Sequence, residues 1–375
     1  MEASRQSLVG RACGLSYLVF NRLDSPRNLS ADMIAPPSSL KTSESPTRPH
    51  IVILGTGGTI AAAASSVANT TDYALTHGID AVISAVPQLQ AVARISGEQV
   101  VNVSSQEINS EVLLILAKRV NDLLRSDTVD AVVITHGTDT MEETAYFLNL
   151  VVKSTKPVVM VGAMRPSSAM SADGPLNLLN AVTLAAAPQS KGMGVLIVLN
   201  DRIGAARYMV KTHTFGTDAF SGQEYGVVGS VVDGKVDFHM APLRIHTSHS
   251  DFDVSGLDTL PAVDIIYGFQ GAGLHLFEAA ISAGVQGIVF AATGNGTLSE
   301  VAKKAAVLAQ ARGIAFVRST RVAEGAVSIK SNDVEFNTVA SNSLNPQKAR
   351  VLLTLALTLT LTNDRERLQN YFDQY

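Results

Sequence analysis

The segment HIVILGTGGTIAAAASS, residues 50–66, is the stretch of the sequence that decides the fold class. An apolar run of strand length ends in Gly-Thr-Gly-Gly, and alanines and small polar residues follow. This pattern predicts a buried strand that stops in a tight turn, where the backbone can approach a ligand closely. A purely structural tight turn is the alternative at this point.

The glycines of this turn match neither of two common phosphate-binding motifs. Counted from Gly55, a dinucleotide-binding fingerprint requires a third glycine where the chain has Ile60. A P-loop requires Gly-Lys where the chain has Ile60-Ala61. The turn therefore argues against a nicotinamide-linked dehydrogenase, and it leaves Thr59, a potential nucleophile, as the residue of chemical interest.

Further apolar runs alternate with helical patterns along the rest of the chain. Residues 110–124 and 140–152 have helical periodicity, and Thr140 with Glu143 predicts a capping box at the start of the second. Asp233-Gly234 predicts a β-hairpin turn. Such alternation predicts an α/β fold with a mostly parallel sheet. The predicted strands are residues 50–55, 99–105, 130–137, 156–163, 194–201, 262–269, 286–293 and 313–320.

Composition and periodicity divide the chain into four parts. Residues 1–48 are rich in Ser and Pro and are predicted to be a leader or disordered extension. Its apolar stretch is interrupted by Arg11, so it matches a secretory signal poorly; another targeting peptide or an overlong gene start are alternatives. Residues 49–241 are predicted to form a larger α/β domain, 242–262 a linker, and 263–375 a smaller α/β domain.

The bulk composition excludes several classes of protein. The formal net charge of −4 over 375 residues weighs against a nucleic-acid-binding role. A single cysteine, Cys13, excludes an intramolecular disulfide and a cysteine metal cluster. The chain has no run of about 18 apolar residues, so no membrane span is expected, and residues 351–362 are better explained as a buried helix.

Polar turns follow the predicted strands, and in open parallel sheets ligands bind at that end of the strands. Thr138 and Asp139 stand just before a predicted helix, whose N-terminus favours negative charge. Lys211 could serve as a base if buried, or stay charged and orient a threonine if it lies near Asp139. His136 is a further candidate base. Ordinary turn chemistry and a surface lysine remain the alternatives.

Taken together, these motifs resemble the bacterial type II L-asparaginase family, which includes the glutaminase-asparaginases. The likeness is carried by TGGTIA (56–61) and ITHGTDTMEETAYFL (134–148), with GEQVVN, SSQE, KPVVMVGAMRP, SADGP, VLND and LNPQKARVLL in order. It covers residues 49–375. The resemblance implies a two-domain fold whose smaller C-terminal domain is flavodoxin-like, and hydrolysis of L-asparagine to L-aspartate and ammonia, with L-glutamine as a further substrate.

The resemblance also implies the roles of individual residues. Thr59 would be the nucleophile of a double displacement, and Tyr73 would hydrogen-bond it. Thr138, Asp139 and Lys211 would form a second catalytic group. The other implied contacts are with the substrate: Ser105 and Gln106 at the α-carboxylate, Asp139 at the α-amino group, and the N–H groups of Thr138 and Ala163 at the amide oxygen.

The resemblance implies no metal and no organic cofactor, and it implies a homotetramer in which each site borrows residues from a neighbouring smaller domain. This sequence departs from the family there. Asp333 and Glu335 are the candidates for the borrowed acid, although a direct alignment places Asn332 at that position, and Thr297 replaces a common asparagine. A periplasmic or secreted location is implied, with a cytoplasmic one as the alternative.

Two rival functions remain open at this stage. One is the glutaminase subunit of a tRNA-dependent amidotransferase, which would require a partner subunit and tRNA. The other is a non-catalytic amino-acid-binding module on the same fold. Because all the positions implied to be catalytic are present, the sequence favours an enzyme.

Overall fold

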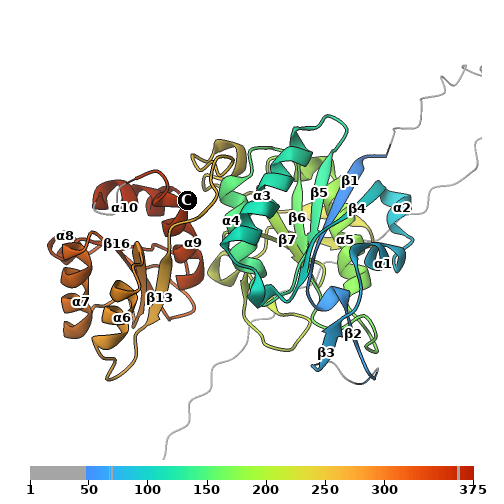
Figure 1. Ribbon diagram of the computed structural model, residues 1–375. Helices are drawn as coiled ribbons and strands as arrows, with labels where there is room; N and C mark the ends of the chain where they lie inside the picture. The colour runs from blue at the N-terminus through green and yellow to red at the C-terminus, as the bar shows by residue number, and fades with distance from the viewer. Residues whose placement is uncertain (1–47, 67, 69–70, 361–363) are drawn as a thin grey trace, which may run out of the picture. The chain divides into compact units, whose positions relative to one another are not determined.

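The computed structural model describes residues 48–66, 68, 71–360 and 364–375. Residues 1–47 of the expected leader, with Cys13, lie outside the described residues. The described part is mixed α/β and contains a large sheet and a smaller all-parallel sheet (Figure 1). No described helix is both long and apolar enough to cross a bilayer.

The large sheet has eight strands in the order β12-β11-β8-β7-β6-β5-β1-β4. The strands from β7 to β4 are parallel, and β8, β11 and β12 continue the sheet antiparallel. The α/β prediction is therefore confirmed. The strands are β1 (His50–Gly57), β4 (Arg94–Val103), β5 (Ala131–Thr135), β6 (Val158–Val161), β7 (Val195–Leu199), β8 (Arg202–Ala205), β11 (Gly229–Val232) and β12 (Lys235–Phe238).

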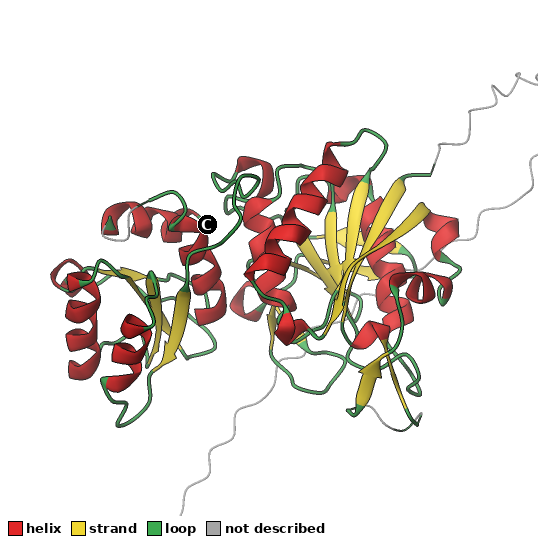
Figure 2. Cartoon of the chain, viewed as in Figure 1, coloured by secondary structure: helices red, strands yellow, loops and turns green. Residues whose placement is uncertain are grey.

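Helices cover both faces of this sheet, as Figure 2 shows. Because side chains alternate along a strand, Ile51 and Ile53 of β1 pack with one group of helices, and Val52 and Leu54 pack with the other. The first group is α1 (Ile79–Ser84), α2 (Leu89–Val92) and α5 (Gly174–Ala186); the second is α3 (Ser110–Arg125) and α4 (Met141–Val151).

The C-terminal sheet has the order β13-β14-β15-β16, and all its strands are parallel. One face packs on α6 and α7, and the other packs on α9, whose apolar residues also join the core that contains α4. The elements are β13 (Val263–Tyr267), β14 (Gly287–Ala292), β15 (Ala315–Thr320), β16 (Thr338–Ala340), α6 (His275–Ser282), α7 (Glu300–Ala311), α8 (Asn332–Glu335), α9 (Pro346–Ala356) and α10 (Arg365–Gln374).

Two short ribbons lie outside these sheets. The first pairs β2 (Ala62–Ala64) with β3 (Tyr73–Leu75), and the second pairs β9 (Val210–Lys211) with β10 (Phe220–Ser221), both antiparallel. Each ribbon carries one residue implied to be catalytic, Tyr73 or Lys211.

Several local predictions are resolved by the structure. The Asp233-Gly234 hairpin is confirmed, since both residues have positive φ (50° and 72°) between β11 and β12. The helix predicted over 351–362 is α9, which is buried but ends at Ala356; residues 361–363 lie outside the described part. Strand β4 begins five residues before the predicted start, because pairing with β1 extends it to Arg94.

The predicted capping box is wrong. Thr140 is the N-cap residue of α4, but its side chain makes no capping hydrogen bond. Its hydroxyl instead donates to the backbone carbonyl of Ser105 at 2.8 Å. A carbonyl supplied by a distant segment therefore competes successfully with the local capping partner. This bond joins the start of α4 to the turn that follows β4.

Candidate active site

The turn after β1 brings two strand ends into close contact. Gly57 and Gly58 have φ of 104° and 82°, a region that side chains rarely adopt. A Cβ on Gly58 would lie 2.3 Å from the Cα of Gly137, at the end of β5. Only glycine permits this approach, which sets the backbone after Gly58 directly against the backbone that leads to Thr138.

Thr59 opens the one-turn 3-10 helix η1 (Thr59–Ala61) at this turn. Its side chain is largely buried, and its Oγ1 lies 2.8 Å from Tyr73 Oη. Tyr73 reaches Thr59 from β3, and both ends of the β2–β3 ribbon are attached near the turn, since the N–H groups of Thr76 and His77 donate to the Ala61 carbonyl.

A second hydrogen-bonded group contains Thr138, Asp139 and Lys211. The Lys211 Nζ donates to Thr138 Oγ1 at 2.8 Å and to Asp139 Oδ1 at 2.6 Å. The Lys211 side chain is 16% exposed, whereas that of Asp139 is 67% exposed. The ammonium is thus held between a buried hydroxyl and a solvent-facing carboxylate.

Both threonine groups border one polar cavity of about 220 Å³. Thr59 and Tyr73 line one part of it, and Thr138 and Asp139 line another. Ser105 and Gln106 contribute from the turn after β4. The full lining is Gly58, Thr59, Thr71, Tyr73, Leu75, Ser104, Ser105, Gln106, Gly137, Thr138 and Asp139. Lys211 reaches the site through its bonds to Thr138 and Asp139.

Ala163 is not among the residues that line the cavity; it is buried in the turn after β6. That turn is held by Asp173, whose two carboxylate oxygens accept from the N–H groups of Met164 and Arg165, each at 2.9 Å. Sequence reasoning quoted SADGP as a family motif but gave Asp173 no task. The available signal was an acidic residue two positions before Pro175, a combination typical of a helix start.

His136 is not placed to act as a base in this cavity. It is fully buried, and its Nδ1 lies 2.7 Å from the Gly137 carbonyl. Burial lowers the pKa of His136 to about 4, although its hydrogen bond to the Gly137 carbonyl works in the opposite direction. Thr56 is also buried, and it donates to the Thr135 carbonyl at 2.9 Å, as a turn residue would.

A second cavity of about 210 Å³ lies beside the same turn, bordered by Ile60, α1 and α5. Its lining is mostly apolar, with Val82 and Leu178 among the side chains. An amide substrate needs convergent polar groups, which the cavity containing Thr59 provides. Among the described residues, no group of three or more His, Cys, Asp or Glu is placed to hold a metal ion.

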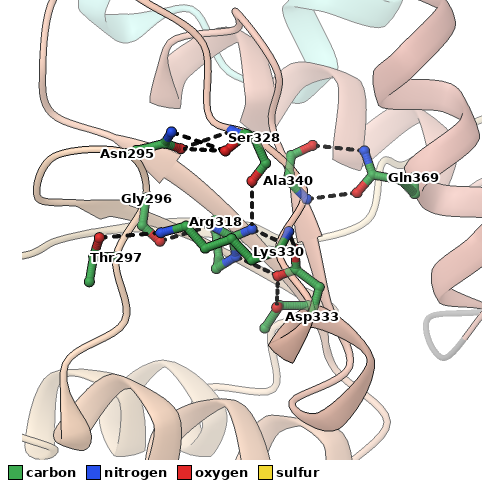
Figure 3. Close-up of polar contacts among 10 residues, drawn as sticks. Asn295, Gly296, Thr297, Arg318, Ser328, Lys330, Asp333, Ala340 and Gln369 are labelled. Carbon is green, nitrogen blue, oxygen red and sulfur yellow. Dashed lines mark hydrogen bonds and ion pairs between the residues drawn. The ribbon is translucent and has the colours of Figure 1, made fainter.

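The structure excludes Asp333 as the acidic residue that would complete the site of a neighbouring subunit. Its side chain is 1% exposed and forms an ion pair with Arg318, whose Nε and Nη2 each lie 2.6 Å from a carboxylate oxygen (Figure 3). Burial works to raise the pKa of Asp333, but hydrogen bonds from Arg318, Thr338 and the Lys330 N–H together hold it below its usual value. The carboxylate is therefore fully used within its own domain.

Figure 3 also shows the polar contacts next to this ion pair. Lys330 Nζ donates to Thr297 Oγ1 at 3.3 Å. Arg318 also binds the carbonyls of Gly296 and Ser328, so it ties the loop containing Thr297 to the loop containing Lys330. Glu335, on α8, is exposed.

Comparisons with known proteins agree with this fold. The family described as "Asparaginase, N-terminal" matches residues 50–244, and "Glutaminase/Asparaginase C-terminal domain" matches residues 262–372. L-asparaginase 2 of Bacillus subtilis is 56% identical over 339 residues, 90% of each chain. A protein of Haemophilus influenzae named "Probable L-asparaginase periplasmic" is 46% identical over 87% of this chain and 93% of its own.

A solved structure is similar as well. The crystal structure of the probable cytoplasmic L-asparaginase from Campylobacter jejuni has a TM-score of 0.85 and 47% sequence identity, and the match covers 88% of this chain and all of that one. Family models match both the N-terminal and the C-terminal part of the chain, and the relatives are about half identical over most of their length. These matches leave no other family assignment. The chain belongs to the asparaginase family.

Proposed function

We propose that this protein hydrolyses the side-chain amide of L-asparagine to L-aspartate and ammonia, with Thr59 as the nucleophile. The observation that carries the proposal is that two threonine hydroxyls border one polar cavity, each with its own activating partner. Thr59 is hydrogen-bonded to Tyr73, and Thr138 is hydrogen-bonded to the Lys211 ammonium. A hydroxyl is a weak nucleophile unless a neighbouring group orients it and assists its loss of a proton.

The reaction proceeds as two displacements. Thr59 Oγ1 attacks the amide carbon, the C–N bond breaks, and ammonia leaves with the proton released from the hydroxyl. Water then adds to the resulting aspartyl ester and restores the free threonine. Tyr73 orients Thr59 in the first step, and Lys211, shared between Thr138 and Asp139, polarises the second threonine.

The remaining residues of the site would hold the substrate. Asp139, the more exposed carboxylate, would bind the α-amino group, and Ser105 with Gln106 would bind the α-carboxylate. The N–H group of Thr138, which lines the cavity, would face the amide oxygen as charge develops on it, and Ala163, which does not line the cavity, would support this contact from the turn after β6. Asp173 would support Ala163 by holding the turn that contains it.

A dual asparaginase and glutaminase activity is the alternative, because the matching C-terminal family is described by both names. Glutamine has one more methylene, and a pocket discriminates one methylene by only about 1–3 kcal/mol. A non-catalytic binding module and an amidotransferase subunit are less well supported, since both activating pairs are assembled within one chain.

The test measures ammonia release from L-asparagine and L-glutamine by wild type, Thr59→Ala and Lys211→Met. Loss of a nucleophile should lower kcat on the order of a thousandfold or more. Lys303→Met is the matched control, because Lys303 pairs with Glu300 on the surface of α7, away from the cavity. Wild type without activity on either substrate, or Thr59→Ala with full activity, would overturn the proposal.

We also propose a homotetramer in which the C-terminal domain of a neighbour completes each site. Exposed Glu335 and the Thr297–Lys330 pair are the groups available for that contact. Light scattering during gel filtration measures the assembly. Activity regained on mixing inactive Thr59→Ala subunits with inactive Glu335→Gln subunits would support shared sites, whereas a fully active monomer would rule them out.

Two further assignments accompany this function. We propose domain limits of 49–241 and 263–375 with a linker at 242–262, and limited proteolysis should then cut within that linker as well as within the predicted N-terminal extension. We propose a periplasmic or secreted location, following the type II resemblance. Fractionation of cells that express the full chain tests it against the cytoplasmic alternative.

A further inference from the structure

The motif LNPQKAR begins helix α9 of the C-terminal domain, and the proposed reaction gives it no task. Asn345 is the N-cap residue of α9, and its Oδ1 accepts from the Lys348 N–H at 2.9 Å. The same side chain uses its Nδ2 to donate to Glu142 Oε1 at 2.8 Å, across 203 positions of sequence. One amide thus caps a helix and reaches the N-terminal domain.

Glu142 also binds the backbone of Lys211. Its second oxygen, Oε2, accepts from the backbone N–H of Lys211 at 2.6 Å. Glu142 lies in the first turn of α4, directly after Thr138 and Asp139, which bind the Lys211 side chain. The backbone and the ammonium of Lys211 are therefore both held by residues 138–142.

Lys348 holds the chain just before Lys211. Its Nζ donates to the carbonyls of Arg207 and Met209, at 3.0 and 2.5 Å. The side chain is 1% exposed, and burial lowers the pKa of Lys348 to about 8, partly countered by the negative charge of Glu142. Arg207 in turn donates to Ser343 and to the carbonyl of Tyr375, so residues 207–211 are held at several points by the C-terminal domain.

Burial of Glu142 and Lys348 is not explained by stability alone. Both side chains are ionisable and nearly inaccessible to solvent, and although Glu142 acts electrostatically on Lys348, the two form no ion pair within 4.0 Å among the described residues. Buried charges are costly, and apolar side chains of similar size often serve stability as well or better. A requirement for fixed geometry at Lys211 accounts for their presence.

We propose that Glu142, Asn345 and Lys348 are positioning residues for Lys211, through which helix α9 of the C-terminal domain sets the backbone that presents the ammonium to Thr138 and Asp139. This rests on the role proposed above for Lys211. The three residues do not border the cavity that holds Thr59, so they act through Lys211 and not on the substrate.

A polarity swap tests the proposal. In Glu142→Gln, one amide oxygen replaces two carboxylate oxygens, so the NH2 would face either the Asn345 NH2 or the Lys211 N–H, and Asn345 Oδ1 cannot accept from it because that oxygen is committed to the helix cap. In Asn345→Asp, two carboxylates would face each other. The double variant Glu142→Gln/Asn345→Asp restores a donor facing an acceptor, keeps one negative charge near Lys348, and retains a good N-cap residue.

Each single variant should lower kcat by roughly tenfold to a hundredfold while KM changes little, since misplacement of a catalytic group by about 1 Å has effects of that size. The swap should recover kcat to within about threefold of wild type, as coupled neighbours do in a double-mutant cycle. Assays are run well below the melting temperature of every variant.

Arg350→Met is the matched control. Arg350 lies on the same helix and links it to Glu143 of α4 at 3.9 Å and to the Val263 carbonyl, but among the described residues it forms no hydrogen bond or ion pair with residues 207–211. It should lower stability and leave kcat unchanged. Folded single variants with wild-type kcat, or an equal loss in Arg350→Met, would show that α9 only stabilises the domain contact.

Failure of the proposed function gives a different result. Wild type inactive on both amides, or Lys211→Met with wild-type kcat, would remove the function or the role of Lys211 before the swap is considered. If wild type is active and Lys211→Met is impaired, but the single variants of Glu142 and Asn345 keep the wild-type kcat, only the positioning proposal is overturned.

Discussion

At the scale of single residues, close backbone approach dominates the site. Gly58 has φ 82° and ψ 179°, a conformation that is essentially restricted to glycine. Its contact with Gly137 sets the strand end that leads to Thr59 beside the one that leads to Thr138. A phosphate ligand is not needed to explain these glycines, because a second strand end occupies the space they leave.

Gly58→Ala should therefore destabilise the protein by more than about 2 kcal/mol, since strain at positive φ and a clash act together. Urea denaturation measures the change. Gly192→Ala is the control: Gly192 has φ 74°, but a Cβ there meets no atom within 4 Å. Equal effects at the two positions would mean that φ, and not the contact with Gly137, is limiting.

His136 should make stability depend on pH between about 4 and 6.5. Burial lowers its folded-state pKa to about 4, so in this range the unfolded chain binds more protons than the folded chain. Stability should then rise as pH increases from 4 to 6.5, by up to about 3 kcal/mol for this group. His136→Asn, which can still donate to the Gly137 carbonyl, should lose that part of the slope. An unchanged slope in denaturation curves would contradict the assignment.

At the scale of elements, the site is assembled from segments that hold one another by side-chain to backbone bonds. Thr140, at the start of α4, binds the carbonyl of Ser105, and Asp173, at the start of α5, binds the turn after β6. Thr140 thus joins its helix to the turn after a different strand, whereas Asp173 holds the turn between β6 and its own helix. The polar turns are therefore positioned by the helices as well as by the sheet.

Thr140→Val should raise KM several-fold, because it releases the turn that carries Ser105 and Gln106, and it should lower stability by about 1 kcal/mol. Steady-state kinetics with L-asparagine measures the first effect. Thr183→Val is the control, since the Thr183 hydroxyl binds the Leu179 carbonyl within its own helix at 2.8 Å. If both variants change KM alike, the Thr140 bond has no special connection to the site.

At the scale of the whole molecule, helix α9 belongs to the C-terminal sheet and to the core that contains α4. The C-terminal domain therefore shares a hydrophobic core with helix α4, which begins next to Thr138 and Asp139. Its own loops depend on Arg318, which is 1% exposed and binds Asp333 and two carbonyls. Removal of that guanidinium leaves a buried carboxylate with no cation beside it and with only the Thr338 hydroxyl and the Lys330 N–H as donors.

Arg318→Met should destabilise the protein by about 3–5 kcal/mol, the usual effect of breaking a buried ion pair on one side. Lys303→Met breaks an exposed pair, whose side chains are 32% and 83% accessible, and should change stability by less than about 1 kcal/mol. Chemical denaturation compares the two. Similar small losses would mean that Asp333 finds another cation or takes up a proton when Arg318 is removed.

The sequence by itself determined the α/β class and the main strands. The family resemblance marked six residues that line the cavity, namely Thr59, Tyr73, Ser105, Gln106, Thr138 and Asp139, together with Lys211 and Ala163, which do not line it. Valine-rich and isoleucine-rich runs report burial directly, and family motifs mark Thr59, Thr138 and Lys211. Tertiary structure alone decided which side chains meet. The hydrogen bond between Asn345 and Glu142 joins residues that are 203 positions apart, and the Thr140 hydroxyl binds the Ser105 carbonyl instead of capping its own helix. It also decided that Asp333 faces Arg318, because pairing and burial depend on neighbours that are distant in the chain.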